Sequence, residues 1–409
     1  MRKQRKRLLA LLVALVIACT ACGSSAMDGV TELTGSSDGT PELREMDDTM
    51  RSAYAAFAYN LFAKCAIGED KSCLISPYSV YSVLSMLANG AGGDTAAQMN
   101  ALLGLTDNSR NAYLAAWKKQ LTGSEGTEFT DSNAIFVRKD LSKSVRKDFL
   151  SVCGDYYRAQ VFAAEMNEDA LNAINEWVSE HTKKRIPKIL DRLDGNTAMV
   201  LLNAITLDAK WSLPFEEYKT TKDTSFYHED GTVSKVEMLH GDADSLYLEN
   251  DYLTGCVKSY DNGEYRYIAL LPKQGVSLED VVSKLSPEMV DGLLKNAEKA
   301  SVLLSIPKYS CEYEKELNEV LSELGMGNAF TNDADFSGLF DGRIDVHVDE
   351  VIHKTQLTLD AEGTTAAAAT AVVMKLSMAL AGKSIKLDRP FVYMIVDQNN
   401  LPMFIGTNR

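Results

Sequence analysis

The chain contains 409 residues, of which 45% are hydrophobic and 24% are charged, and its formal net charge is −15. This length exceeds that of a minimal module and fits one large or two ordinary domains with an ample hydrophobic core. The acidic balance argues against a general nucleic-acid-binding role, so we expect no nucleic-acid partner.

The first 22 residues have the layout of a secretory signal. A basic stretch at 1–7 precedes an apolar run at 8–18, which is too short to span a bilayer as a mature helix. Cys19 and Cys22 both follow small residues, and each position resembles the processing site of bacterial lipoproteins; ordinary secretion with incidental cysteines is the alternative. Because two acyl chains suffice for stable anchoring, the first interpretation predicts an exported protein held at the bacterial cell surface by its N-terminal lipid.

Residues 23–45 are rich in Gly, Ser and Asp and nearly free of large apolar side chains, so we expect a flexible tether before a folded domain at 46–409. Within this domain, apolar spacing predicts amphipathic helices at 46–65, 175–190 and 315–324, the last ended by Gly325. Ser76 followed by Pro77 predicts the start of another helix, because serine caps helices and proline fits their first turn.

The strand signals are short and alternate between apolar and polar residues. They predict strands at 133–137, 265–271, 302–306, 345–351, 356–359 and 392–396. Helices dominate the first half of the chain and strands the second, which favours the α+β class over repeated βαβ units. No internal repeat of 20 to 50 residues is visible.

The five cysteines outside the leader do not suggest a disulfide framework or a zinc site. Their number is odd and none forms a CxxC pair, so we expect small buried hydrophobic side chains. A Cys65–Cys73 bridge is conceivable, but nothing else in the sequence supports it. The five are Cys65, Cys73, Cys153, Cys256 and Cys311.

Two polar groups have the composition of binding sites. Asp345, His347 and Asp349 alternate along an expected strand and would share one face, as cation ligands do, yet no further ligand can be named. The basic run 183–185 could bind a polyanion, but a solvated helix end is the simpler interpretation. No Walker loop, GxGxxG after a strand or GxSxG motif occurs, so we expect no metal, no cofactor and no catalytic site.

The stretch 362–375, EGTTAAAATAVVMK, is ambivalent in structure. Its four consecutive alanines favour a helix, whereas its threonines and valines favour a strand. A surface helix or linker of small residues is one interpretation. If the chain is extended instead, small side chains share one face and could enter between strands that are already packed. That face carries Thr364, Ala366, Ala368, Thr370, Val372 and Met374.

Nine segments of the chain, from about residue 50 to the C-terminus, resemble the serpin family in their order. DAEGTTAAAATAV looks like the family's hinge, and VIHKTQLTLD, at 351–360, looks like the strand that leads into it. LLNAITLDAKWSLPFE, at 201–216, is similar to the family's asparagine-to-tryptophan segment. LISPYSVYSVLSMLANGAGGDTAAQM, at 74–99, matches its serine-proline helix start.

The resemblance implies a serpin fold of the α+β class, with three β-sheets, about eight or nine helices and an exposed reactive-centre loop at about 361–385. It also implies an inhibitor and not an enzyme. A serine protease attacks the loop, and the cleaved hinge side enters the central sheet as an extra strand. We expect a monomer whose covalent partners are serine proteases. The hinge would comprise Gly363, Thr364, Thr365, Ala366, Ala367, Ala368 and Ala369.

The position of the scissile bond can be counted in two ways that disagree. Counting forward from Gly363 at the family's usual spacing places the bond between Ser377 and Met378. Counting back from the proline after the loop places it after Ala379. We favour the forward count because the length that inserts is constrained, and Lys375 is the one basic alternative. Small or linear apolar residues at the bond suit an elastase-like protease.

The resemblance further implies polar residues that hold the central sheet closed, and it places Trp211 where the loop first enters. Ala361 departs from the family, which usually has an acid there, and the missing charge would loosen the top of the sheet. A non-inhibitory binding protein of the same fold is the alternative, although the bulky, charged or proline hinge residues usual in such relatives do not occur from 363 to 373. The polar residues are Ser76, Ser79, Asn203 and His353.

Overall fold

The computed structural model describes residue 27 and residues 29–34, 39–122, 127–244, 246–261, 263–342, 344–364 and 382–409. The leader and part of the expected reactive-centre loop fall outside these ranges. The expected site residues outside the described part are Cys19, Cys22, Thr365, Ala366, Ala367, Ala368, Ala369, Lys375, Ser377, Met378 and Ala379.

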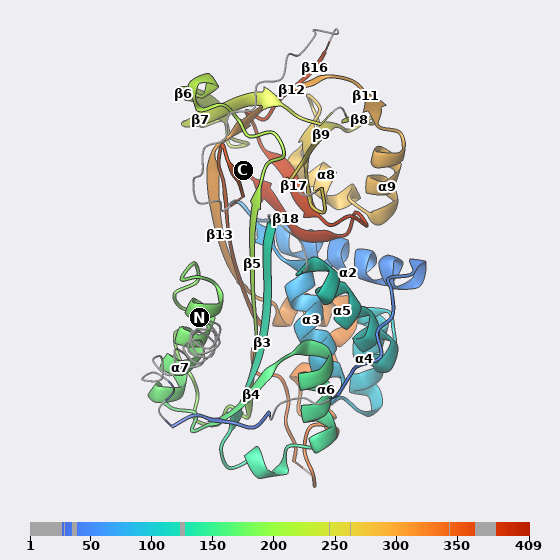
Figure 1. Cartoon of the computed structure of the whole chain (residues 1–409), viewed down its shortest axis with the longest axis vertical. Helices are drawn as coiled ribbons and strands as arrows, with labels where there is room; N and C mark the ends of the chain where they lie inside the picture. The colour runs from blue at the N-terminus through green and yellow to red at the C-terminus, as the bar shows by residue number, and fades with distance from the viewer. Residues whose placement is uncertain are drawn as a thin grey trace, which may run out of the picture.

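Nine α-helices lie in the described residues, and most of them gather on one side of the molecule in Figure 1. Their ends follow local signals in the sequence. Pro77 occupies the first turn of α3, and the Ser76 side chain accepts a hydrogen bond from the backbone N–H of Ser79, as expected for a cap. The helices are α2 (Asp48–Ala66), α3 (Pro77–Ala88), α4 (Gly93–Leu103), α5 (Asp107–Leu121), α6 (Lys147–Tyr157), α7 (Glu168–His181), α8 (Leu278–Lys284), α9 (Pro287–Lys295) and α10 (Asn318–Leu321).

The strands form three sheets, which we name A, B and C. Sheet A has the order β1 (Thr31–Glu32), β4 (Gln160–Ala164), β3 (Thr127–Arg138), β5 (Met199–Lys210), β15 (Gly363–Thr364), β14 (Ile352–Leu359), β13 (Tyr309–Glu316). Sheet B has the order β11 (Glu298–Lys299), β8 (Leu246–Glu249), β9 (Leu253–Ser259), β10 (Arg266–Pro272), β17 (Phe391–Val396), β18 (Pro402–Asn408), β2 (Leu74–Ile75). Sheet C has the order β16 (Lys383–Lys386), β12 (Val302–Pro307), β7 (Val233–Asp242), β6 (Thr221–Tyr227).

Sheet A is covered on both faces, and β5 shows this best. Ile205 and Leu207 point into the main core, which the sheet shares with α2, α3 and sheet B. Leu202 and Ala204 point the other way, into a smaller core closed by α7. In Figure 1, the long strands β3 and β5 run between α7 on one side and the other helices on the opposite side. A strand added to the middle of sheet A would therefore be buried on both faces.

The α+β class and the three sheets are as expected from the sequence, but two helices differ from their predicted extents. The helix expected at 175–190 is α7, which begins earlier and ends at His181, because Lys183 and Lys184 have positive φ. The helix expected at 315–324 is shorter than predicted, since β13 runs to Glu316 and α10 spans four residues. Gly325, at φ 105°, does interrupt the turn that follows.

The strand expected at 345–351 is wrong. This segment has no regular structure, and β14 begins only at Ile352. The argument that Asp345, His347 and Asp349 share one strand face therefore fails. His347 Nε2 lies 3.4 Å from Asp349 Oδ1, and the described residues contain no group of three side chains placed to hold a metal ion.

Part of the expected tether lies against the folded body. β1 pairs with the edge strand β4, and the backbone N–H of Leu33 donates to the carbonyl oxygen of Val161 at 2.6 Å. The backbone N–H of Val161 in turn donates to Thr34 Oγ1 at 3.1 Å. The composition of this segment gave no strand signal, so the pairing depends on the free edge that β4 offers.

The five cysteines of the body are buried and free, as expected. Burial raises the pKa of each thiol, which keeps these side chains uncharged and unreactive. Among the described helices, none combines the length and the apolar character that a membrane span requires.

Candidate functional site

The hinge forms a two-residue strand inside sheet A. β15 lies between β5 and β14 and pairs with both in antiparallel register, Gly363 opposite Lys210 and Thr364 opposite Ala209 on one side, and Thr364 opposite Leu359 on the other. A Cβ atom on Gly363 would lie 2.1 Å from the carbonyl oxygen of Ala209, so only glycine fits at this position.

A tight turn delivers β15 into the sheet. Asp360 Oδ1 accepts hydrogen bonds from the backbone N–H groups of Glu362 at 2.9 Å and Gly363 at 3.1 Å. The backbone N–H of Asp360 donates to the carbonyl oxygen of Gly363 at 3.0 Å. This side-chain-stabilised turn reverses the chain directly after β14, so that the next residues run back along the same strand.

Trp211 and the four residues after it, segment 211–215, hold the outer side of this turn. Trp211 donates from its backbone N–H to Glu362 O at 2.9 Å and from its indole Nε1 to Asp360 O at 3.1 Å. The backbone N–H of Phe215 donates to Ala361 O at 2.9 Å. Ala361, where the resemblance led us to expect an acid, is 9% exposed and belongs to the main core. Hydrogen bonds from segment 211–215 thus fix the turn in the absence of that charge.

Thr364 is the first hinge side chain that enters the interior. It is 1% exposed, and its hydroxyl shares a hydrogen bond with the hydroxyl of Tyr260. The Tyr260 ring stacks on Trp211, with ring centres 4.4 Å apart and planes within 10°. Burial raises the pKa of Tyr260, so its phenol stays protonated. The hinge, β5 and sheet B therefore meet at one buried contact.

Beyond Thr364, the middle of sheet A has a gap in its hydrogen bonding. β5 pairs with β3 and β15, and β14 pairs with β13 and β15, but among the described residues no ladder joins β5 to β14. A cavity of about 80 Å³ lies on the core side, and its lining includes Ser79, Asn203 and His353. The two strand edges that face each other are available for a strand between them.

The polar cluster expected from the sequence is divided into two groups, and each contributes side chains to the lining of this cavity. In the first group, His353 Nε2 accepts a hydrogen bond from the backbone N–H of Ser76 at 3.0 Å. The Ser76 hydroxyl donates to Met403 O at 2.9 Å and accepts from the backbone N–H of Ser79. Burial lowers the pKa of His353 to about 4, so the imidazole is neutral at physiological pH.

The second group surrounds Asn203. Its amide nitrogen donates to Asp131 Oδ1 at 2.6 Å and to Asn133 Oδ1 at 2.9 Å, whereas its Oδ1 is buried without a hydrogen-bond partner in the described residues. Lys118 Nζ lies 3.1 Å from Asp131 Oδ2, and Tyr78 also donates to that oxygen. Sequence reasoning missed Asp131, Asn133 and Lys118. The signal was available in TDSNAIF, where Asp131 and Asn133 alternate and so share one face of the strand, directly before its apolar part.

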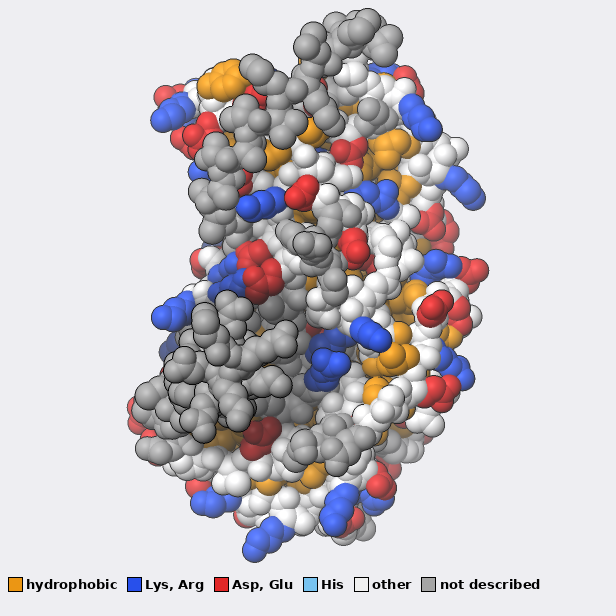
Figure 2. Space-filling view, viewed as in Figure 1, with side chains coloured by type: hydrophobic (Ala, Val, Ile, Leu, Met, Phe, Trp, Pro, Cys, Tyr) orange, Lys and Arg blue, Asp and Glu red, His pale blue; other side chains and the backbone are white. Residues whose placement is uncertain are grey.

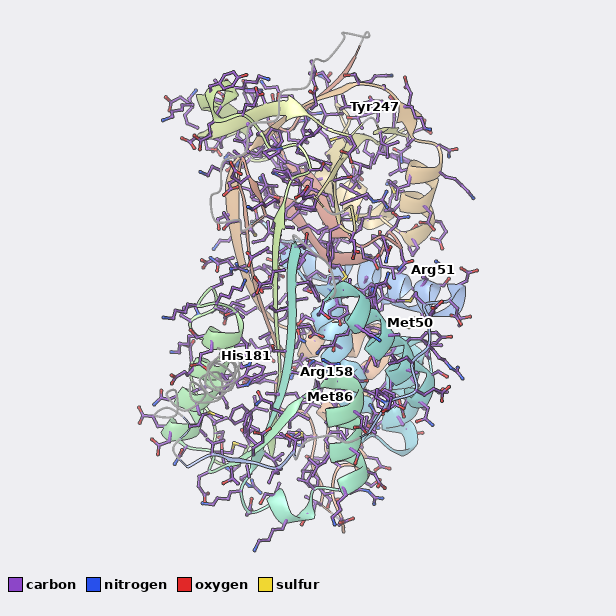
Figure 3. The ribbon with its side chains drawn as sticks, in the orientation of Figure 1. Met50, Arg51, Met86, Arg158, His181 and Tyr247 are labelled. Atoms are coloured by element: carbon purple, nitrogen blue, oxygen red, sulfur yellow. The ribbon has the colours of Figure 1, made fainter. Side chains whose placement is uncertain are left out.

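After residue 381 the described chain belongs to a different sheet. β16 runs parallel to β12 in sheet C, with Lys383 opposite Val302. Lys383 Nζ lies 4.6 Å from the centre of the Tyr247 ring and 2.9 Å from Glu298 Oε2. Figure 3 labels Tyr247 at the end of the molecule that carries sheet C, far from Met86 among the helices. Residues 365–381 therefore connect the middle strand of sheet A to the edge of sheet C.

A family model described as "Serpin (serine protease inhibitor)" matches residues 52–408. The chain belongs to the serpin family. The plasma serine protease inhibitor of Homo sapiens is 31% identical to this serpin over 361 residues, which are 86% of this chain and 87% of the relative. Members of the family are generally protease inhibitors, and some are non-inhibitory.

Two solved serpins align over most of this serpin. Tengpin, a thermophilic serpin, in its native state has a TM-score of 0.86 and 34% identity, with 93% of this chain and 99% of that chain covered. In its latent state the TM-score is 0.78, at 32% identity, with 90% and 99% covered. Thyroxine-binding globulin in complex with thyroxine has a TM-score of 0.79 at 27% identity, with 88% and 98% covered.

Two of the three basic side chains in the run 183–185 of this serpin are paired with acidic side chains. Lys183 Nζ lies 2.6 Å from both Glu128 Oε2 and Asp208 Oδ2, and Arg185 pairs with Asp208 as well. On the face shown in Figure 2, Lys and Arg side chains are interspersed with Asp and Glu. We therefore take the gap between β5 and β14 in sheet A as the candidate functional site, because it can accept a strand with small side chains.

Proposed function

We propose that this serpin is an irreversible suicide-substrate inhibitor of serine proteases that acts by insertion of its cleaved loop into sheet A. The observation that carries the proposal is the place of β15, because the hinge already forms the first two residues of a strand between β5 and β14. Residues 365–373 contain no charge and no proline, so their side chains would not prevent β15 from being extended by these residues.

The register of β15 defines what a longer inserted strand would contact. Continuing the pairing with β5 one residue at a time brings Met374 opposite Met199, the first residue of β5. Ten residues, 365–374, would then fill the gap, a length of roughly 33 Å at about 3.3 Å per residue. This length agrees with a scissile bond a few residues further on, as in the forward count to Ser377 and Met378.

If insertion continued in this register, one polar side chain of the loop would come between the two polar groups. Thr370 would come opposite Asn203 on β5 and opposite His353 on β14. Thr364 points into the core, and alternation gives Thr370 the same direction. Its hydroxyl could donate to the unpartnered Oδ1 of Asn203, so insertion would satisfy a buried acceptor that is unpaired among the described residues.

The chemistry of inhibition would use the nucleophile of the protease. Its serine oxygen attacks the carbonyl carbon of Ser377 and the bond to the nitrogen of Met378 breaks. An acyl-enzyme ester forms, and the serine proton passes to that nitrogen, which becomes the amine terminus of the fragment 378–409; its strands β16, β17 and β18 keep this fragment in sheets B and C. Insertion of 365–374 then drags the acylated protease along sheet A. Distortion of the protease active site stalls attack by water on the ester, because deacylation requires accurate alignment of the reacting groups.

We assign an elastase-like specificity to the inhibitor. Ser377, Met378 and the alternative Ala379 are small or linear apolar residues, which suit a shallow apolar specificity pocket. Lys375 would suit a trypsin-like protease, but cleavage there shortens the segment between the hinge and the acylated residue by two residues. We also propose export and lipid attachment at Cys22 or Cys19, which mass spectrometry of the mature N-terminal peptide from the membrane fraction tests.

Incubation with pancreatic elastase, followed by denaturing gel electrophoresis, tests the function. An inhibitory serpin gives a covalent complex that survives SDS, together with loss of elastase activity. Cleavage without a complex would instead support a non-inhibitory binding protein, a role that the likeness to thyroxine-binding globulin makes the principal alternative. A catalytically inactive elastase with its nucleophilic serine replaced by alanine is the matched control and should give no complex.

A further inference from the structure

A second cavity lies at the end of sheet A where β5 begins, on the face that α7 covers. Its volume is about 740 Å³, and residues of segments 189–197 and 347–350 line it together with the start of β5. Six apolar side chains of the lining belong to the smaller core closed by α7 or pack against it. These six are Ile189, Leu190, Leu193, Val200, Leu202 and Ile352.

The apolar side chains nearest the end of the sheet are incompletely covered. Val200 is half-buried although β5 is a central strand, and Ile352, the first residue of β14, is half-buried as well. Further along β5, Leu202 and Ala204 point to the same face and are buried. The α7 side of the sheet therefore has room for further apolar side chains between β5 and β14 at this end.

The register of β15 indicates which loop residues would reach this cavity. Continued along β5 and β14, it brings Ala371 between Leu202 and Ile352 and brings Val373 opposite Val200. Even-numbered residues of the inserted strand would point into the main core, so the odd-numbered ones would face α7. Two apolar side chains of the loop would thus meet the apolar part of the lining.

Lys375 is the single charged residue in the stretch 363–382. Strand alternation places it on the same face as Ala371 and Val373, just beyond the first residue of β5. The polar part of the cavity lining at this end contains more acidic than basic side chains, which makes it complementary in charge to a lysine. Its charged residues are Arg192, Asp194, Asp349 and Glu350.

Glu350 is the acid best placed to receive this lysine. In the continued register it lies opposite residue 373, so Lys375 becomes its diagonal neighbour, a separation that long side chains can span. Its carboxylate is 46% exposed and lies 3.8 Å from the guanidinium of Arg192, a side chain that is 90% exposed. Asp349, in contrast, already lies 3.4 Å from His347 Nε2.

We propose that this cavity is the docking site for residues 371–375 of the inserted loop, with Ala371 and Val373 in its apolar part and Lys375 paired with Glu350. Docking here presupposes the proposed function, because the loop reaches this end of the sheet only by insertion. It would hold the end of the strand to which the acylated protease is connected, where fraying would release the distortion. Lys375 is then a positioning residue and not the residue at the scissile bond.

A peptide competition tests the docking without any protease. A synthetic peptide with the sequence of residues 365–377, TAAAATAVVMKLS, and its Lys375→Gln form compete for incorporation into the uncleaved protein. Mass spectrometry measures the two bound peptides once their ratio is constant. We expect about threefold more of the lysine peptide, as for a partly exposed ion pair, and a ratio near one at about 1 M salt.

Substitutions in the protein identify the acid that binds the lysine. Glu350→Gln should bring the ratio close to one, and Glu350→Lys should make a Lys375→Glu peptide preferred over the Lys375→Gln peptide. Asp349→Asn is the matched control, since it removes the neighbouring acid and should leave the wild-type ratio nearly unchanged. Because both peptides compete within one sample, altered stability of a variant affects them equally.

A wild-type ratio of one would overturn the inference, and so would a ratio that Glu350→Gln leaves unchanged or that only Asp349→Asn abolishes. Failure of every peptide to incorporate would overturn it as well.

A Val373→Ala peptide tests the apolar part of the docking site. We expect about fivefold less of it than of the parent peptide, because two methyl groups no longer fill the cavity. Equal binding of the two peptides would overturn this part of the assignment. Oligomers of the peptide-free protein in size-exclusion chromatography would assign the cavity to the loop of a second copy and also overturn the inference.

These outcomes are distinguishable from failure of the proposed function. A protein that prefers the lysine peptide through Glu350 but forms no covalent complex with elastase retains the docking site and loses the inhibitor assignment. A protein that traps elastase but binds the lysine and glutamine peptides equally remains an inhibitor and loses the docking site.

Discussion

The hydroxyl groups of Thr364 and Tyr260 share a buried hydrogen bond that joins the hinge to sheet B. Tyr260 also stacks on Trp211, whose backbone and indole N–H groups hold the turn before the hinge. The first inserted side chain is therefore docked on an aromatic pair before any cleavage. This arrangement makes position 364 the most informative place for substitution.

We expect Thr364→Arg to convert the inhibitor into a substrate. The side chain enters a site that is 1% exposed, where an unpaired guanidinium costs several kcal/mol, so insertion slows and deacylation wins. Titration against elastase should show the stoichiometry of inhibition rising at least about tenfold. Thr364→Ser keeps a hydroxyl for Tyr260 and should stay close to the wild type. Stable complexes at wild-type stoichiometry with Arg at this position would contradict the insertion mechanism.

Cleavage of the loop is expected to raise thermal stability. Insertion adds ladder hydrogen bonds along both β5 and β14 and buries small side chains between two cores. The loop is cut with a protease that is not inhibited, and the unfolding midpoints of cut and intact protein are compared by calorimetry. An unchanged or lower midpoint after a confirmed cut would favour the non-inhibitory alternative.

Thr370 should account for part of the rise in thermal stability that follows cleavage of the loop. In the register of β15 it comes opposite Asn203 and His353, and its hydroxyl can satisfy the buried Oδ1 of Asn203. Thr370→Val has nearly the same shape but lacks the donor, so the cleaved form should lose about 1–2 kcal/mol relative to cleaved wild type. Thr364→Val, Thr370→Ala and the double variant form a series that separates hydroxyl loss from volume loss. The register is wrong if Thr370→Val leaves the cleaved form unchanged while Thr364→Val destabilises it.

His353 is expected to make folding stability sensitive to mild acid. Burial lowers its pKa to about 4, below the usual value of about 6.5 for histidine. Between these values the unfolded chain takes up a proton that the folded chain does not, so stability falls with decreasing pH and the loss is complete below about pH 4. The full contribution is about 3 kcal/mol for a side chain this deeply buried.

The measurement is denaturant unfolding of the wild type and His353→Gln at several pH values from 7 to 4. Glutamine can accept the hydrogen bond from Ser76 N–H without titrating. The difference in free energy of unfolding between the two proteins should narrow or reverse as the pH falls. Parallel profiles would show that His353 is not the titrating group.

The sequence predicted the class of the fold and many of its helices and strands better than the contacts between them. Ser76 and Pro77 mark the start of α3 because capping is a local interaction, and Gly363 is required where β15 passes Ala209. The strand expected at 345–351 failed because alternation of Asp, His and Val is the same in an irregular segment as in a strand edge. Only the tertiary context, with β14 beginning at Ile352, distinguishes them.

At the candidate site, too, the contacts between residues could not be predicted from the sequence. Trp211 and Thr364 lie at the hinge and His353 lines the cavity beside the gap, whereas Asn203 is bonded to Asp131 and Asn133 and not to His353. Those partners are on β3, and their contact depends on the register between β3 and β5, which pairs Asn133 with Asn203.

The scissile bond provides the last prediction, and the register of β15 gives it a structural basis. A strand that continues this register ends with Met374 opposite Met199, so residues 375–377 are left to connect the sheet to the acylated protease. Cleavage after Ser377 leaves three connecting residues, whereas cleavage after Lys375 leaves one, which would hold the protease closer to the end of the sheet. We therefore expect elastase to be trapped and trypsin to cleave without trapping. Mass spectrometry of the C-terminal peptide released from the trapped complex should find Met378 as its first residue. A peptide that begins at Leu376 would contradict the assignment, and one that begins two residues beyond Met378 would support the backward count to Ala379.

Replacement of Ser377 by Arg tests the specificity separately: the inserting length is unchanged, so trypsin should then be trapped and elastase inhibition should fall by at least about tenfold.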